Sequence, residues 1–164
     1  DLLFGSADAL SVPAEQLPRT ATRFFEEWKD LKKEAARLKE DLARAQMEGL
    51  TSKAVEVGGL KVVVATLENA DVEELIKAAS MISGKDYVAI LGSEKDGAKI
   101  VAAVGKTGLA RGLAAGEIVK AATKVVGGGG GGKPEIAQGG GPQAEKLAEA
   151  LEAGLARVRA SSGA

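Results

Sequence analysis

The sequence predicts an α/β protein: an N-terminal helical, coiled-coil-like subdomain followed by a small globular α/β subdomain with a four-stranded sheet. Residues 18–48 contain no glycine and repeat apolar side chains at alternating spacings of four and three, which is typical of a long helix with one apolar seam. After Gly49, short runs rich in β-branched residues alternate with glycine turns and amphipathic stretches. We therefore expect a helical or dimerisation subdomain at 1–49 and a globular subdomain at 50–164.

The N-terminal subdomain should contain a short helix, a turn set by Pro13 and Pro18, and a long helix that ends at Gly49. A rise of ~1.5 Å per residue makes the long helix about 45 Å in length, which is more than a small domain can cover. We therefore expect its seam to form a homodimer interface, with packing against the chain's own globular part or its short first helix as the alternative. The seam residues are Phe24, Trp28, Leu31, Ala35, Leu38 and Leu42.

The globular subdomain should begin with two strands in residues 53–68, joined by the two-residue turn Gly58-Gly59. Asp71 and Glu74 have the spacing of a capping box and predict a helix over 71–82. The remaining expected elements are strands at 86–91 and 98–104, and helices at 113–125 and 142–159, the last with Pro142 at its first position.

The composition excludes several classes of chemistry. The chain has no cysteine and no histidine, which excludes disulfides, thiolate or Ser-His-Asp nucleophiles and an ordinary zinc site. The carboxylates are scattered at charge-pair spacing on helix surfaces, so we expect no metal site, no catalytic residues and no enzyme activity in this chain alone. The absence of cysteine, of an apolar run long enough to span a bilayer and of a signal peptide predicts a cytoplasmic protein or an excised fragment.

Residues 127–141, "GGGGGGKPEIAQGGG", are the most unusual segment. The spacing from Gly127 to Lys133 fits a phosphate loop, but Pro134 stands where a Ser or Thr would hold Mg²⁺. Lys106-Thr107 fails the same test, because Ile100 replaces the leading glycine. A flexible tether would mix glycine with serine, which this segment lacks. Two readings remain: backbone N–H groups presented to an anion near a helix N-terminus, or close packing.

Charge favours a nucleic-acid partner. Between Gly92 and Lys133, seven basic residues face three acidic ones, although the net charge of the whole chain is −1. A basic segment that ends in glycines is suited to a phosphate backbone. The chain has only three Phe, one Tyr and one Trp, so we expect recognition of duplex shape rather than stacking of single strands.

The glycine-rich segment resembles the signature of the DHHA1 domain found at the C-terminus of alanyl-tRNA synthetases. The specific part is its interior, Pro134-Glu135-Ile136-Ala137-Gln138, preceded by the basic Lys133 and flanked by glycines. Upstream, "LSVPAEQLPRTATRFFEEWKDLKKEAARLKEDLA" is similar to the helical section of the archaeal enzymes. The resemblance covers essentially the whole chain.

The resemblance implies a domain that contacts the outer corner of tRNA, helps couple aminoacylation with editing, and dimerises through its helical part. The parent protein would be an ATP-dependent alanine–tRNA ligase that uses ATP, Mg and Zn in domains absent from this sequence, so this chain itself should need no cofactor. Related phosphodiesterases carry a histidine after the glycines where this chain has a different pattern, and we expect no hydrolysis. The alternative function is a purely structural dimerisation or interaction module without RNA affinity of its own.

We therefore predict three kinds of partner: tRNA, with tRNA-Ala as the expected species, a second copy of the chain, and the catalytic and editing domains of the parent enzyme, with no membrane. The predicted RNA-binding residues are Gly127, Gly128, Gly129, Gly130, Gly131, Gly132, Lys133, Gln138, Gly139, Gly140, Gly141, Lys106, Arg111, Lys120 and Lys124.

Overall fold

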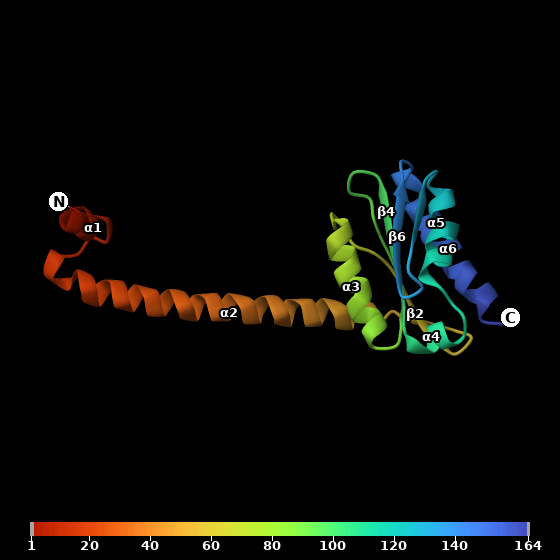
Figure 1. Cartoon of the computed structure of the whole chain (residues 1–164), viewed down its shortest axis with the longest axis horizontal. Helices are drawn as coiled ribbons and strands as arrows, with labels where there is room; N and C mark the ends of the chain where they lie inside the picture. Colours follow the sequence, from red (N-terminus) through yellow and green to blue (C-terminus); the bar gives the residue numbers. More distant parts are fainter. Residues whose placement is uncertain (1, 164) are drawn as a thin grey trace. The chain divides into compact units, whose positions relative to one another are not determined.

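The computed structural model describes residues 2–163, which divide into two compact units. The first unit ends at Ala45, and the second begins at Gln46. Three helical elements come first along the chain: α1 (Leu2–Ala9), the 3₁₀ turn η1 (Ala14–Gln16) and the long helix α2 (Leu17–Thr51), whose last residues belong to the second unit (Figure 1). None of the helices in residues 2–163 is both long and apolar enough to cross a membrane.

Helix α2 begins and ends differently from the prediction. Pro18 lies in its first turn, where its missing N–H leaves no hydrogen bond unmade. Gly49 does not end the helix, which continues to Thr51. Buried Met47 holds this last turn against the globular core, and the Thr51 hydroxyl donates a 3.0 Å hydrogen bond to the Met47 carbonyl. The intrinsic cost of a helical glycine is about 1 kcal/mol, which such packing offsets.

The second unit is built on one sheet with strand order β1-β2-β3-β4-β6-β5. Only the β2–β3 pair is parallel. The strands are β1 (Val55–Val57), β2 (Leu60–Thr66), β3 (Val88–Ser93), β4 (Ala98–Val104), β5 (Gly129–Gly132) and β6 (Ile136–Gly141). The four-stranded prediction is wrong, because the glycine-rich segment itself supplies β5 and β6.

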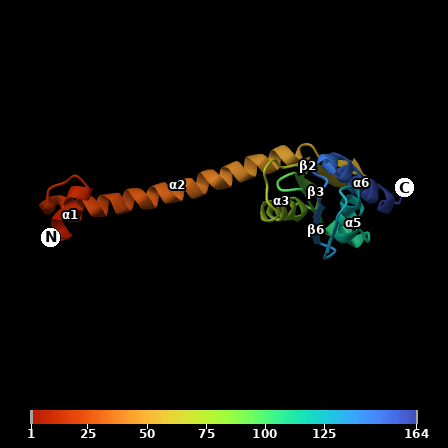
Figure 2. The same cartoon turned by 90° about the horizontal axis from the view of Figure 1, so that it is seen from above.

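Two helical layers cover the sheet (Figure 1). Helix α3 (Val72–Gly84) packs on one face, and α5 (Ala115–Val125) and α6 (Leu147–Ser161) pack on the other, as the view in Figure 2 also shows. The short α4 (Lys106–Ala110) was not expected. The last helix does not start at Pro142: the 3₁₀ turn η2 (Ala144–Lys146) comes first and α6 begins at Leu147.

Two local predictions are confirmed. Gly58 and Gly59 connect β1 to β2 with φ of 56° and 80°, the left-handed conformations that a two-residue hairpin turn requires. At the start of α3, the Asp71 carboxylate accepts from the Glu74 backbone N–H and the Glu74 carboxylate accepts from the Asp71 N–H, both at 2.9 Å. Both motifs depend on contacts within a few residues of sequence.

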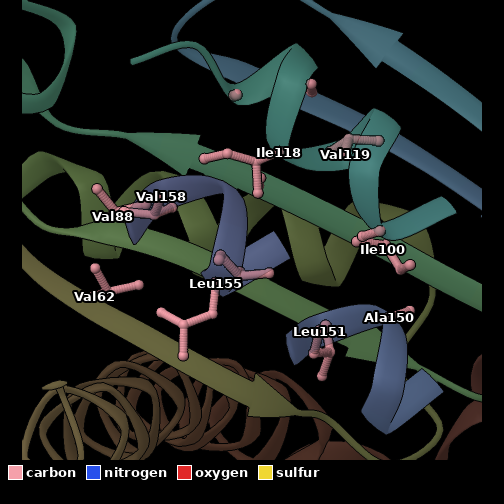
Figure 3. Close-up of a cluster of buried hydrophobic side chains, with 14 of the residues drawn as sticks. Val62, Val88, Ile100, Ile118, Val119, Ala150, Leu151, Leu155 and Val158 are labelled. Atoms are coloured by element: carbon pink, nitrogen blue, oxygen red, sulfur yellow. The ribbon is translucent and has the colours of Figure 1, made fainter. Parts of the chain in front are cut away.

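The larger core lies between the sheet and helices α5 and α6 (Figure 3). Ile90 and Ile100 from the strands and Ile118 from α5 are completely buried. Burial of each such side chain contributes roughly 1.5–3 kcal/mol. Gly154 lets α6 approach closely, because a Cβ there would already lie 3.3 Å from side-chain atoms of Ile90 and Ile118. This packing fixes α5, the helix that in turn positions β5.

Candidate nucleic-acid interface

The glycine-rich segment forms a β-hairpin at one edge of the sheet. Strand β6 pairs with β4 along its length, and β5 pairs with β6, so that β5 is the edge strand. An edge strand leaves alternate backbone N–H and C=O groups without a strand partner. The prediction of a glycine loop that presents N–H groups near a helix N-terminus is therefore wrong, because most of these glycines lie in hydrogen-bonded strands.

One set of glycines is required by close packing. A Cβ at Gly130 would lie 2.6 Å from the Gln138 carbonyl oxygen and 2.7 Å from Cγ1 of Val119 on α5. At Gly128 the nearest atom would be the Gly140 oxygen at 1.8 Å, and at Gly132 the Ala137 Cα at 2.6 Å. No side chain fits between the 128–132 segment and its neighbours at these positions. The packing alternative for the glycine segment is thus correct for part of it.

The other glycines of β5 are not required by the fold. A Cβ at Gly129 or Gly131 would meet no atom within 4 Å, and neither residue has a positive φ. Because successive residues of a strand point to opposite faces, these two look away from α5. Their cross-strand partners are Gly140 and Gln138 on β6. We call Gly129, Gly131 and Gln138 the open glycine face: bare backbone with one exposed side chain, that of Gln138. Gly140 borders this face but is required by packing, because a Cβ there would lie 2.2 Å from the Ala98 carbonyl oxygen.

Lys99, which was not among the predicted site residues, borders this face. Lys99 on β4 is the cross-strand partner of Gly140, which places it on the same face of the sheet. It is half-buried, and its ammonium group donates to the Lys95 carbonyl. The alternation of side chains along β4 could be read from the sequence. It places Lys99 beside the glycines only when β6 is known to pair with β4.

The predicted basic residues do not gather into one patch. Lys133 is exposed in the β5–β6 turn. The backbone ties this turn to the end of β4, through Val104 N–H to the Glu135 oxygen (2.9 Å), so Lys133 and Lys106 lie at the same end of the sheet. Lys120 and Lys124 are exposed on α5, the helix that covers the opposite face from the open glycine face.

Arg111, a predicted RNA-binding residue, and Thr107, next to the predicted Lys106, already make hydrogen bonds within the chain. The Arg111 guanidinium donates to the Gly58 carbonyl in the β1–β2 turn. Next to Lys106, the Thr107 hydroxyl and backbone N–H donate to the Asp86 carboxylate, and these bonds, with Lys106 adding a smaller effect, lower the pKa of Asp86 below its usual value. A charged Asp86 offsets part of the positive potential of Lys106. Lys106, Lys120, Lys124 and Lys133 are the exposed cations that remain from the prediction.

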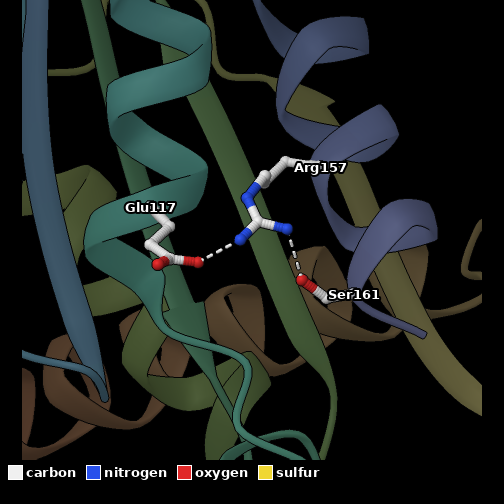
Figure 4. A network of polar contacts seen from close by, with 3 residues as sticks. All are labelled: Glu117, Arg157 and Ser161. Carbon is white, nitrogen blue, oxygen red and sulfur yellow. Dashed lines mark hydrogen bonds and ion pairs between the residues drawn. The ribbon is translucent and has the colours of Figure 1, made fainter. Parts of the chain in front are cut away.

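The described residues show no arrangement for metal binding. Across residues 2–163, no group of three or more His, Cys, Asp or Glu side chains is placed to hold a metal ion. Glu117 on α5 and Arg157 on α6 form an exposed ion pair between helices (Figure 4), and the other ion pairs found in the described residues lie within α2.

Helix α2 carries the second predicted surface. Its seam is exposed in the single chain, with 41% of Phe24, 53% of Trp28, 66% of Leu31, 56% of Leu38 and 59% of Leu42 open to solvent. Phe25 stacks on Trp28 with ring centroids 5.9 Å apart, and the Lys32 ammonium group lies 4.9 Å from the Trp28 ring centroid. Apolar side chains exposed in a row of this length mark an interaction site.

The glycine hairpin, the sheet and the covering helices together define the class of protein. The family model of the DHHA1 domain matches residues 59–160, and the chain belongs to this family.

Curated relatives place the chain within a particular group of DHHA1 proteins. It is 51% identical over 160 residues to an alanine–tRNA ligase of Methanothrix thermoacetophila, and 48% identical over 159 residues to that of Methanosarcina barkeri. These matches cover 97% and 96% of this chain but 18% and 17% of the relatives, so the chain spans less than a fifth of their length.

A solved structure agrees with the relatives. The C-Ala domain from Aquifex aeolicus alanyl-tRNA synthetase matches with a TM-score of 0.59 and 32% identity, over 65% of this chain and 96% of that one. The chain thus corresponds to the C-terminal, DHHA1-containing domain of alanyl-tRNA synthetases, as the glycine motif predicted.

Proposed function

We propose that this chain binds tRNA and forms dimers as the C-terminal domain of an alanine–tRNA ligase, contacting the outer corner of the tRNA and helping to couple aminoacylation with editing. Its expected partners are tRNA-Ala, a second copy through α2, and the catalytic and editing domains of the parent enzyme in the cytoplasm. ATP, Mg and Zn would be used in those other domains, and this chain would perform no chemical step.

The observation that carries this proposal is the open glycine face. Gly129 and Gly131 are glycine although neither their backbone conformation nor their surroundings within the chain demand it. Side-chain-free backbone at a sheet edge allows another molecule to approach closely and to use N–H groups as hydrogen-bond donors. Gln138 and Lys99 on the same face, and Lys133 in the adjoining turn, add an amide and two cations that suit a sugar–phosphate backbone.

The proposal is tested by equilibrium binding of the chain to tRNA-Ala and to an unrelated tRNA across a salt series. Affinity should fall as salt rises, because bound cations release counterions from the RNA. Two variants probe the face: Lys133→Glu, expected to weaken binding about tenfold and flatten the salt dependence, and Gly131→Leu, which places a bulky side chain in open space on the face. Lys146→Glu, an exposed charge reversal at the start of α6 on the face of the sheet opposite the open glycine face, is the matched control and should bind like the parent chain.

A second candidate function is favoured by the exposed seam of α2: a structural dimerisation module with no RNA affinity of its own. Under that reading, a folded, dimeric chain would bind neither tRNA at moderate salt. Equal binding by Lys146→Glu, Lys133→Glu and Gly131→Leu would instead show that RNA contacts another surface.

A further inference from the structure

The β5–β6 turn holds an acidic residue among basic ones. Lys133, Pro134 and Glu135 form this turn, and all three are exposed. Lys106, which follows the end of β4, lies at the same end of the sheet. A carboxylate at this place weakens the attraction of the two lysines for a phosphate backbone, so its presence in a candidate nucleic-acid surface calls for an explanation.

The fold uses the backbone of Glu135 and not its side chain. The Glu135 carbonyl accepts the Val104 N–H at 2.9 Å, and the neighbouring Pro134 carbonyl accepts the Ala115 N–H at 2.8 Å. Both are main-chain contacts, and the one at position 135 does not depend on which side chain stands there. In the part of the chain that the structure describes, no ion pair includes Lys133 or Glu135. Both side chains are therefore available to another molecule.

The turn presents these two side chains on a fixed backbone. The two carbonyl contacts tie the turn to β4 and to the start of α5. The ring of Pro134 also restricts its own φ to about −65°. The Cα atoms of Lys133 and Glu135 are two residues apart, so they lie at most about 7 Å from each other. A cation and a hydrogen-bond acceptor are thus held close together, within the reach of neighbouring groups of one nucleic-acid strand.

An RNA duplex offers few donors to a carboxylate. Its major groove is too deep and narrow for side chains, whereas its shallow minor groove displays the ribose 2′-hydroxyls and the base edges. The 2′-hydroxyl occurs in every nucleotide, next to a phosphate, while the other minor-groove donor, the amino group of guanine, occurs only at G·C pairs. A hydrogen bond to an ionised acceptor is about twice as strong as a neutral one. Such a bond offsets the repulsion between the carboxylate and the phosphates.

We propose that Glu135 accepts a hydrogen bond from a ribose 2′-hydroxyl while Lys133 contacts a phosphate of the same strand, so that the β5–β6 turn distinguishes RNA from DNA. The open glycine face supplies donors for the sugar–phosphate backbone, and Glu135 supplies an acceptor that a deoxyribose cannot use. The inference rests on the proposed tRNA binding and adds to it a residue that determines specificity.

Binding to two forms of tRNA-Ala tests this role. One form has ordinary riboses, and the other has 2′-O-methyl riboses throughout, which keep the phosphates and the guanine amino groups but have no 2′-hydroxyl to donate. The parent chain should bind the ordinary form at least about tenfold more tightly. Glu135→Ala should bind the ordinary form about tenfold more weakly than the parent and the methylated form no more weakly. Glu135→Gln, which keeps an uncharged acceptor, should fall between the two.

Two further variants serve as controls. Glu149→Ala removes an equally exposed charge from the first turn of α6, on the opposite face of the sheet, and should keep the preference of the parent. Lys133→Gln should weaken the binding of both forms alike and reduce the salt dependence by about one phosphate contact, whereas Glu135→Ala should leave the salt dependence unchanged. The urea midpoints of the Lys133 and Glu135 variants should equal that of the parent, because neither side chain makes an ion pair in the described residues.

The outcomes separate this role from the function on which it rests. A parent chain that binds neither form of tRNA-Ala contradicts the proposed tRNA binding and the role of Glu135 with it. If the parent binds and Glu135→Ala keeps the same preference for ordinary riboses, only the role of Glu135 is contradicted. Tighter binding of both forms by Glu135→Ala would show that the carboxylate merely repels RNA, and this result would also overturn the proposal.

Discussion

At the scale of single residues, alternate glycines of β5 have different reasons to be glycine. Gly130→Ala forces a methyl group against the Gln138 oxygen and Val119, so we expect a loss of about 1–3 kcal/mol in the free energy of unfolding. Gly129→Ala meets nothing and should be neutral, or stabilising by up to about 1 kcal/mol through the unfolded state. Urea unfolding of the two variants decides the matter, and equal losses would contradict the assignment of the open face.

Asp86 gives the chain a residue-scale pH dependence. It has a positive φ of 64°, and its carboxylate accepts the Thr107 backbone N–H at 2.7 Å and the Thr107 hydroxyl. These bonds, with Lys106 as a smaller cause, place its folded pKa below the unfolded value. Its stabilising contribution is therefore complete at a pH above the unfolded pKa, and it is lost as the pH falls through the folded pKa.

Asp86→Asn tolerates the left-handed backbone but removes the titrating group. The stability difference between the parent and this variant should be largest at neutral pH and should shrink on acidification, as measured by urea unfolding at a series of pH values. Thr107→Val, which keeps the carboxylate and removes its hydroxyl donor, should reduce the same pH dependence. A difference that is constant with pH would mean that the Asp86–Thr107 contact does not form in solution.

At the scale of elements, α6 is joined to the rest of the unit by an ion pair and by apolar packing. Arg157 contacts Glu117 on α5 and also donates to the Ser161 hydroxyl at 2.6 Å (Figure 4). Both charged side chains are substantially exposed, so Glu117→Gln should cost less than about 1 kcal/mol and less still at high salt. Leu155, which is 4% exposed in the core, should cost about 2–5 kcal/mol when changed to Ala.

Measuring both variants by the same unfolding assay, at low and high salt, shows which interaction holds α6. A larger loss for Glu117→Gln than for Leu155→Ala would reverse this ranking. Arg157→Gln is the matched partner of the ion-pair variant, and a double-mutant cycle with Glu117→Gln isolates their coupling.

The elements differ in how far the sequence could predict them, and the reason is the range of the interactions that form them. The capping box of α3 and the Gly58-Gly59 turn depend on neighbouring residues and were predicted correctly. Strand β5 is made of glycine, which disfavours strands, and it exists because β6 pairs with β4 more than 30 residues earlier in the chain. Lys99 joins the candidate site through that same distant pairing, so neither could be found from local pattern alone.

At the scale of the whole molecule, the chain combines a globular unit that buries its apolar side chains with a helix that does not. Leu31, Leu38 and Leu42 remain more than half exposed, whereas the core residues of the second unit are almost inaccessible. A helix derives most of its stability from the packing of an apolar face, and α2 lacks such packing along its seam in a single chain. If the chain dimerises through α2 as proposed, this helix should be stable only to the extent that two copies associate.

The helix content should consequently depend on protein concentration. We expect the ellipticity at 222 nm to fall when the protein is diluted through the range in which the dimer dissociates. The urea midpoint of the globular unit, measured from the protection of the β3 and β4 amides against hydrogen exchange, should stay constant. Leu31→Asn/Leu38→Asn should show the low ellipticity at every concentration and keep the same globular midpoint, since both residues lie in the first unit. Concentration-independent ellipticity of the parent chain would mean that α2 is stabilised without a second copy.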